Sequence, residues 1–367
     1  MFTAKDFIPT NYSKTIEQGN FQWTAPSNIA LVKYWGKKDN QIPANPSVSF
    51  TLNNCKTITK LAFAKKEIST VLNETGEKFS FDLLFEGKPK EDFKPKIQKF
   101  LERIEIYLPF LKDYHFTIDT ENTFPHSSGI ASSASGMAAL AMNLMRLEKE
   151  LNPNMTENYF YQKASMLARL GSGSACRSIK GEVVVWGNHN NISGSSELFG
   201  VEFPNIIHDV FKNFQDTILL VDKGEKQVSS TVGHDLMHNH PYAERRFAQA
   251  HENLDKLITI FENGDLEEFI KIVESEALTL HSMMMTSMPY FILMKPNTLE
   301  IINAIWKFRN ATKIPVCFTL DAGANVHVLY PNKNKEIVLQ FIQSELVGYC
   351  QNGQYICDEI GTGAVEN

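Results

Sequence analysis

A run of small residues that leads into an apolar helix constrains the fold of this chain more than any other feature. The run FPHSSGIASSASG fills residues 124–136, and Met137, Leu140, Ala141 and Leu144 follow it at helical spacing. Free backbone N–H groups and the positive end of the helix dipole would face whatever the loop holds. No Gly-Lys-Ser/Thr follows, so this is no Walker A loop. The segment predicts a phosphate-binding loop, although a serine-rich cap and linker would have the same composition.

Secondary-structure signals along the chain predict a mixture of strands and helices. The expected strands are 21–34, 47–52, 57–64, 79–85, 114–120, 182–186, 216–221, 314–320 and 325–330. The expected helices are 92–110, the segment after 136, 156–170, 242–262 and most of the rest of 229–311. Regular alternation of single strands and helices is absent from this pattern, so the sequence predicts an α+β fold.

A polar stretch in the middle of the chain marks a domain boundary. Residues 187–200 are rich in glycine, serine and asparagine, and a chain of 367 residues suits two domains. We therefore expect one domain over residues 1–195 and a second over residues 196–367.

Composition limits the partners and the compartment. The formal charge of −6 disfavours nucleic acid as a main partner. Five scattered cysteines without a CxxC pair favour reduced thiols over disulfides or zinc. The N-terminus lacks an apolar signal core, and no apolar run approaches the length of a membrane span. These features predict a cytoplasmic protein without a membrane partner.

Two further segments gather cations and hydroxyls suited to an anion. Residues 25–39, APSNIALVKYWGKKD, place Lys33, Tyr34 and Lys37 at the end of an alternating strand. Residues 169–178, RLGSGSACRS, add two serines, open glycine backbone and an arginine fork. A solvated strand end would explain the lysines equally well. Cys176 is interpreted as a small buried residue, because nothing in the sequence supplies it with a base.

Three later features are less specific. Residues 226–233, KQVSSTVG, can form a helix cap around Ser230. Asp321 precedes Gly323 between two predicted strands, which is typical of a turn. His234 and His238 have the spacing of a metal pair on a helix, but no HExxH pattern or acidic ligand accompanies them. We therefore interpret the histidines as a solvated, polar helix end and assign no metal ligands.

Five segments in order resemble the mevalonate diphosphate decarboxylase family of the GHMP kinase superfamily. The resemblance covers residues 25 to about 330, and its most specific part is NIALVKYWGK at residues 28–37. The phosphate loop, the GSGSACRS loop, the SSTVG stretch and DAGAN at residues 321–325 follow. Three positions depart from the family pattern, namely Pro46 for serine, His234 for methionine and Ala324 for proline.

The resemblance implies a two-lobed GHMP kinase fold with the active site in the cleft between the lobes. It implies ATP-dependent decarboxylation of mevalonate 5-diphosphate to isopentenyl diphosphate in the mevalonate pathway, with Mg²⁺ and a homodimer. The implied catalytic residues are Asp321 and Lys33. The implied substrate-binding residues are Tyr34, Lys37, Ser172, Ser174, Arg177 and Ser230. The implied ATP-binding residues are Ser127, Ser128, Gly129, Ser132, Ser133 and Ser135.

Three alternatives stay open on the sequence. Mevalonate 5-phosphate could replace the diphosphate, since one phosphate more or less changes only a few hydrogen bonds. A GHMP kinase of the mevalonate 3-kinase type would phosphorylate without decarboxylating. A non-catalytic sensor on the same fold is disfavoured, because both small-residue loops, Asp321 and the lysines are all present.

Overall fold

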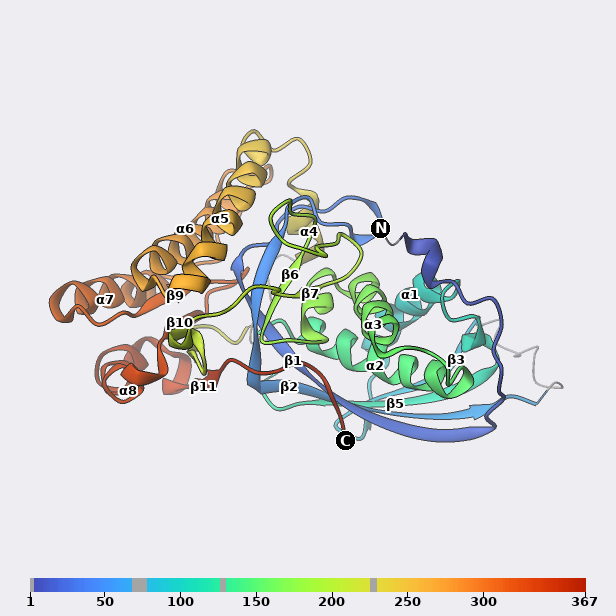
Figure 1. Ribbon diagram of the computed structural model, residues 1–367. Helices are drawn as coiled ribbons and strands as arrows, with labels where there is room; N and C mark the ends of the chain where they lie inside the picture. The colour runs from blue at the N-terminus through green and yellow to red at the C-terminus, as the bar shows by residue number, and fades with distance from the viewer. Residues whose placement is uncertain (1–2, 68–77, 126–129, 225–229) are drawn as a thin grey trace.

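The computed structural model describes residues 3–67, 78–125, 130–224 and 230–367. Its ribbon forms two lobes side by side, each built from an antiparallel or mixed sheet and its covering helices (Figure 1). The α+β class predicted from the sequence is confirmed.

The first lobe is organised around a sheet of eight strands among the described residues. The strands are β1 (Gln18–Val32), β2 (Ser47–Lys65), β3 (Ser80–Phe85), β4 (Lys88–Pro89), β5 (Tyr114–Asn122), β6 (Val183–Trp186), β7 (Val201–Glu202) and β12 (Val365–Glu366). Neighbouring strands run antiparallel except β3 and β5. The helices α1 (Lys94–Ile104), α2 (Ser132–Leu151) and α3 (Glu157–Gly171) gather on one side of the sheet (Figure 1).

The second lobe contains a smaller sheet in the order β11-β8-β10-β9. Its strands are β8 (Gln215–Leu219), β9 (Cys317–Thr319), β10 (Val326–Tyr330) and β11 (Tyr355–Glu359). Its helices are α4 (Ser230–Asp235), α5 (Ala243–Asn263), α6 (Leu266–Met285), α7 (Pro296–Thr312) and α8 (Lys335–Phe341). The chain then returns to the first sheet, where β12 pairs with β1. The division at residues 195/196 stays a prediction.

One long strand, β2, replaces the two strands expected at 47–52 and 57–64. The polar Asn53-Asn54 pair indicated a break, but the strand continues through it. Asp358 on β11 explains the continuity, because its carboxylate accepts the backbone N–H groups of Asn53, Asn54 and Cys55 at 2.7–2.9 Å. A partner 300 residues away in the chain therefore satisfies the backbone at the expected break.

The ends of α1 and α5 depend on residues close to them in the sequence. The helix expected at 92–110 is shorter, because α1 ends at Ile104 and a turn leads to Leu108. Pro109 disfavours helical geometry at Leu108, the residue before it, so one helix cannot run on to residue 110. The end of α5 agrees with the sequence, since Gly264 takes a left-handed conformation with φ of 75° directly after Asn263.

Fully buried charges join α2 to α3 in the core of the first lobe. Lys163 donates to Glu148 at 2.5 Å and to the Tyr107 carbonyl at 2.9 Å. Tyr12 donates to the same Glu148 oxygen at 3.2 Å. Burial raises the pKa of Glu148, and the ammonium group of Lys163 opposes that rise. The lysine therefore compensates a carboxylate that would otherwise lie uncharged or unpaired in the core.

Replacing Lys163 with methionine should lower the free energy of unfolding by about 3 kcal/mol, because a buried carboxylate then lacks its partner. The full deficit should be present above the raised pKa of Glu148. It should shrink as the pH falls toward the ordinary glutamate range, where both states bind the proton. Urea titrations at several pH values measure this. The double variant with Glu148→Leu is the control and should recover most of the loss, whereas full stability of Lys163→Met alone would contradict the prediction.

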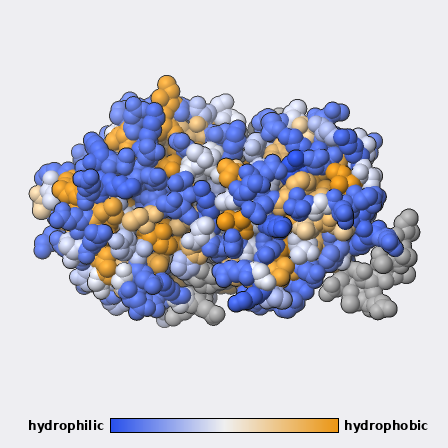
Figure 2. Space-filling model, turned by 90° about the horizontal axis from the view of Figure 1, so that it is seen from below, coloured by the Kyte–Doolittle hydropathy of each residue, from blue (hydrophilic) through white to orange (hydrophobic). Residues whose placement is uncertain are grey.

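The face of the protein that Figure 2 shows is mostly polar. Seen from below, hydrophilic residues cover most of the described surface and hydrophobic ones form small separate groups (Figure 2). Among the described residues, no helix is both long and apolar enough to cross a membrane. All five cysteines are free thiols.

Candidate active site

A cavity of about 310 Å³ receives side chains from both lobes. The first lobe contributes the end of β1, the start of α2 and the loop after α3. The second lobe contributes residues of α4, α6 and the turn between β9 and β10. The cavity is lined by predicted site residues Lys33, Tyr34, Lys37, Ser133, Ser172, Ser174, Arg177 and Asp321. Segments far apart in the sequence therefore meet at one hollow.

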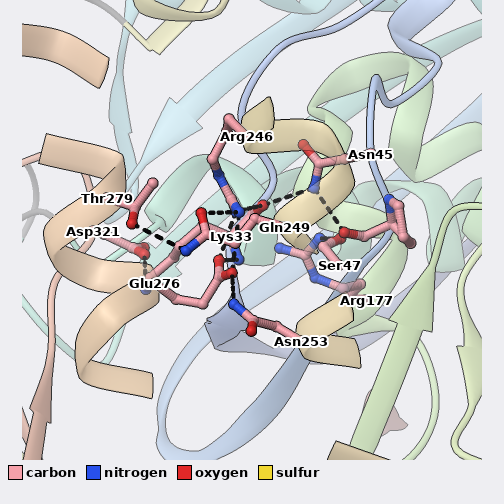
Figure 3. A network of polar contacts seen from close by, with 11 residues as sticks. Lys33, Asn45, Ser47, Arg177, Arg246, Gln249, Asn253, Glu276, Thr279 and Asp321 are labelled. Carbon is pink, nitrogen blue, oxygen red and sulfur yellow. Dashed lines mark hydrogen bonds and ion pairs between the residues drawn. The ribbon is translucent and has the colours of Figure 1, made fainter. Parts of the chain in front are cut away.

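Lys33 and Asp321 form an ion pair inside this cavity. Lys33 follows the last residue of β1, and its Nζ lies 3.1 Å from Oδ1 of Asp321 (Figure 3). The lysine side chain is 2% exposed, whereas that of Asp321 is 29% exposed. Burial lowers the pKa of Lys33, and the Asp321 carboxylate partly opposes this. The pair thus leaves a carboxylate open to the cavity with a buried cation behind it.

Arg177 is a second buried cation at the cavity. It lies in a short 3-10 helix, Gly173–Ser178, and donates to Ser47 at 2.5 Å and to Asn28 at 3.4 Å (Figure 3). Its Nε has no hydrogen-bond partner among the described residues. These contacts orient the guanidinium at the cavity.

Aromatic rings form one wall of the cavity. The ring of Tyr34 lies 4.6 Å from that of Trp186 and 4.2 Å from that of His234, measured between centroids. Gly173 is needed beside them, because a Cβ there would lie 2.9 Å from the Tyr34 ring. Burial raises the pKa of Tyr34, so its hydroxyl is available as a donor near neutral pH. Lys37 lies nearer the surface, with its Nζ 3.3 Å from Asp235.

The predicted phosphate loop meets the cavity at the start of α2. Ala131 and Ser133 line the cavity, and Ser133 lies 3.3 Å from Ser172 between hydroxyl oxygens. Ser135 is fully buried, and its hydroxyl lies 2.6 Å from that of Thr57. This placement favours a packing role for Ser135 over a contact with nucleotide. Ser127, Ser128 and Gly129 lie outside the described residues.

A second cavity of about 220 Å³ lies on the other side of the α2 start. Ser132, Ser133, Gly136 and Leu140 line it on α2. Apolar residues of β3, β5, α1 and the turn before α1 complete the lining, among them Phe85, Ile118, Ile97 and Phe93. Lys96 on α1 lines both cavities. Lys96 was not among the residues predicted from the sequence, because a lysine on the polar side of a helix carries no signal of its own.

The histidine-rich segment differs from its prediction. His234 was expected at a solvated helix end, but it is buried, and its Nδ1 accepts the N–H of Gly36 at 3.0 Å. Burial lowers its pKa to about 3, so the ring is neutral. His238 is exposed and His240 is buried. No group of three or more histidine, cysteine, aspartate or glutamate residues in the described chain could hold a metal ion.

Two other residues, Ser230 and Cys176, were singled out from the sequence. Ser230 is the first residue of α4, but its side chain lies outside the described residues. Cys176 is buried, and burial raises the pKa of its thiol to about 12, which agrees with its interpretation as an inert residue. The roles assigned to the individual site residues stay predictions.

A helix start flanked by two cavities, one of them rich in cations, is the arrangement expected of a protein that handles phosphorylated small molecules. Residues 25–197 match the diphosphomevalonate decarboxylase-like N-terminal domain. Residues 217–362 match the mevalonate 5-diphosphate decarboxylase C-terminal domain. Diphosphomevalonate decarboxylase of Debaryomyces hansenii is 31% identical over 87% of this chain and 81% of its own. The chain belongs to the diphosphomevalonate decarboxylase family.

Solved structures agree with this assignment. Mevalonate diphosphate decarboxylase from Staphylococcus aureus is 26% identical and has a TM-score of 0.79, covering 95% of this chain and 98% of its own. MDDEF in complex with MVAPP, AMPPCP and magnesium is likewise 26% identical, with a TM-score of 0.79. The match covers 95% of this chain and 99% of that chain. The two-lobed fold is therefore shared over nearly the whole chain.

Proposed function

We propose that this chain converts mevalonate 5-diphosphate and ATP to isopentenyl diphosphate, ADP, phosphate and CO2. The observation that carries this proposal is the Lys33–Asp321 pair, at 3.1 Å, in a cavity shared with Arg177 and the start of α2. A carboxylate that is open to the cavity suits a substrate hydroxyl, and the cations suit a substrate with several negative charges.

The reaction must expel a tertiary hydroxyl while CO2 is lost. Asp321 would accept or orient the proton of the 3-hydroxyl as that oxygen attacks the γ-phosphorus of ATP and ADP leaves. The C–O bond to the new phosphate then breaks, and the electron pair released by decarboxylation forms the double bond. Lys33, buried behind Asp321, would stabilise the negative charge that gathers around the transferred phosphate.

Substrate alignment depends on groups remote from the reacting oxygen. Arg177, Ser172 and Ser174 line the same cavity. Tyr34 and Lys37 complete the cationic end of the cavity. Holding the diphosphate and carboxylate here would align the 3-hydroxyl with ATP, which is the main contribution a protein makes to phosphoryl transfer. Ser230 is proposed to contact the same diphosphate.

ATP would lie across the start of α2. Its phosphates would meet the helix N-terminus near Ser132 and Ser133, and its base would enter the apolar second cavity. Mg²⁺ is usually held by substrate phosphates and water with one or two protein ligands, and this fits a site without a cluster of acidic residues among the described part of the chain. Hydroxyls at the start of α2 would complete its ligands, and the ion would neutralise phosphate charge. Homodimer assembly and a cytoplasmic location stay predictions.

The first experiment is to measure ATP-dependent CO2 release and ADP formation from mevalonate 5-diphosphate. Equal amounts of both products are expected. ADP without CO2 would show a non-decarboxylating kinase, and turnover of the 5-phosphate alone would shift the substrate by one phosphate. Absence of both products with every substrate, together with a failure to bind ATP, would favour a sensor.

Lys96→Met is expected to raise the KM for ATP about tenfold with a smaller effect on the KM for mevalonate 5-diphosphate. Lys96 lines both cavities, and its ammonium would contact the phosphates between base and substrate. Lys94→Met on the same helix is the matched control, since Lys94 pairs with Glu91 at the surface and lines neither cavity. Initial rates at varied ATP concentration give the KM for ATP. An unchanged value in Lys96→Met would show that Lys96 does not contact the nucleotide.

A further inference from the structure

Three side chains hold the backbone of Lys33 in place. Glu276 accepts its N–H at 2.9 Å, while Arg246 and Asn45 donate to its carbonyl at 3.0 and 2.9 Å (Figure 3). Lys33 lies just beyond the end of β1, where strand pairing no longer fixes the backbone. The direction in which its side chain leaves β1 is therefore determined by these contacts.

Glu276 is itself fixed on α6. The side chain is fully buried and binds both terminal nitrogens of Arg246, at 3.0 and 2.5 Å. Asn253 adds a third donor at 2.6 Å (Figure 3). A buried ion pair of this kind contributes little net stability, because desolvation offsets the attraction. Its clearest structural consequence is the fixed position of Lys33.

The same helix holds the backbone of Asp321. Five residues after Glu276, the buried His281 donates from Nε2 to the Asp321 carbonyl at 3.1 Å. Burial lowers the pKa of His281 to about 4, so the ring is neutral near pH 7. Since the carbonyl can only accept, the single N–H of the neutral ring must be on Nε2.

We propose that α6 sets the separation of Lys33 and Asp321, with Glu276 and His281 as positioning residues that hold the two backbones. This inference rests on the proposed function, in which Lys33 and Asp321 act together. The two residues come from different lobes, 288 positions apart, so no local element fixes their distance. One rigid helix that binds both backbones supplies the fixed spacing. Neither Glu276 nor His281 is among the residues that line the cavity, so each acts through its neighbour.

The first test replaces Glu276 with glutamine, which keeps the size but removes one of the two acceptor oxygens. We expect kcat to fall about 30-fold, since displacement of a reacting group by about 1 Å can cost about 100-fold in rate. KM for both substrates should stay within about threefold, because the diphosphate site at Arg177 keeps its contacts with Ser47 and Asn28.

Glu274→Gln is the matched control on the same helix. Glu274 is also buried and paired with an arginine, Arg309 at 2.6 Å, but it faces α7 and contacts no cavity residue in the described structure. Both variants should lose similar thermal stability, and only Glu276→Gln should lose kcat. Equal losses of kcat in the two variants would overturn the positioning role.

The second test compares two replacements of His281, and it decides the proposal should Glu276→Gln fail to fold. Glutamine can present an N–H near the position of Nε2, whereas methionine fills similar space without a donor. We expect His281→Met to lower kcat about tenfold and His281→Gln to recover it to within about threefold of the wild type. Full activity in His281→Met, or no recovery in His281→Gln, would overturn the proposal.

Failure of this inference and failure of the proposed function give different results. A wild-type protein that releases no CO2 from mevalonate 5-diphosphate defeats the function, whatever the variants do. A wild-type protein that is active, with variants that retain kcat or lose only KM, defeats the role of α6 and leaves the function intact.

Discussion

Asp321→Asn is expected to reduce both CO2 release and ADP formation from mevalonate 5-diphosphate by about 1000-fold or more. The amide keeps the shape of the side chain but cannot accept the hydroxyl proton, and general acid–base groups contribute about 100- to 10,000-fold. The change also leaves Lys33, which is 2% exposed, without its carboxylate at 3.1 Å. Both effects act on the chemical step.

Nucleotide binding and a control variant distinguish a loss of the chemical step from a general loss of structure. Nucleotide binding by the variant should stay close to that of the wild type, because Asp321 does not line the second cavity, where the base of ATP would lie. Asp222→Asn is the control, since Asp222 lies in the same lobe, pairs with Lys295 near the surface and lines neither cavity. A variant that retains more than about a tenth of the activity would exclude a role in proton transfer.

Arg177→Lys should lower kcat/KM for mevalonate 5-diphosphate by about 100-fold or more. A guanidinium fork that binds Ser47 and Asn28 while it lines the cavity cannot be copied by a single ammonium group. Loss of a buried, charge-assisted contact costs about 2–5 kcal/mol, which is a factor of about 30 to 5000 and includes the expected change. The effect should fall mainly on the KM for the diphosphate substrate.

Titration of each variant with mevalonate 5-diphosphate, with ATP absent, tests the contact directly. Arg309→Lys is the control for replacing a partly buried, ion-paired arginine, since Arg309 binds Glu274 in the second lobe. Arg309→Lys should lower the free energy of unfolding but leave the affinity for mevalonate 5-diphosphate unchanged. Unchanged affinity in Arg177→Lys would mean that Arg177 only supports the fold of the loop around Ser47.

The fold was predictable where local patterns decide it. The period of the apolar residues located α2, α3 and α5, and Gly264 gave the end of α5. Local patterns gave the wrong bounds for elements whose backbone is hydrogen-bonded to distant residues. The carboxylate of Asp358 accepts the backbone N–H groups of Asn53 and Asn54, so β2 continues through them. Residues close to Asn53 in the sequence do not indicate this contact. The return of β12 to the first sheet likewise depends on contacts at the far end of the chain.

The site divides in the same way. Loop composition and ordered motifs identified Lys33, Arg177 and Asp321 as candidates, because each lies in a segment with a distinctive pattern. Lys96, Glu276 and His281 had no such pattern, since a polar residue on a helix is usually solvated. His234 was expected to be solvated for the same reason, yet the rings of Tyr34 and Trp35 enclose it.

The order of residue types in the sequence by itself determined the α+β class, the small-residue loop at a helix start and the family. Those features depend on spacing along the chain, which the sequence contains directly. Only the tertiary structure decided that Lys33 and Asp321 lie 3.1 Å apart and that α6 holds both backbones. Distances between residues hundreds of positions apart follow from the packing of whole elements, which no local pattern specifies.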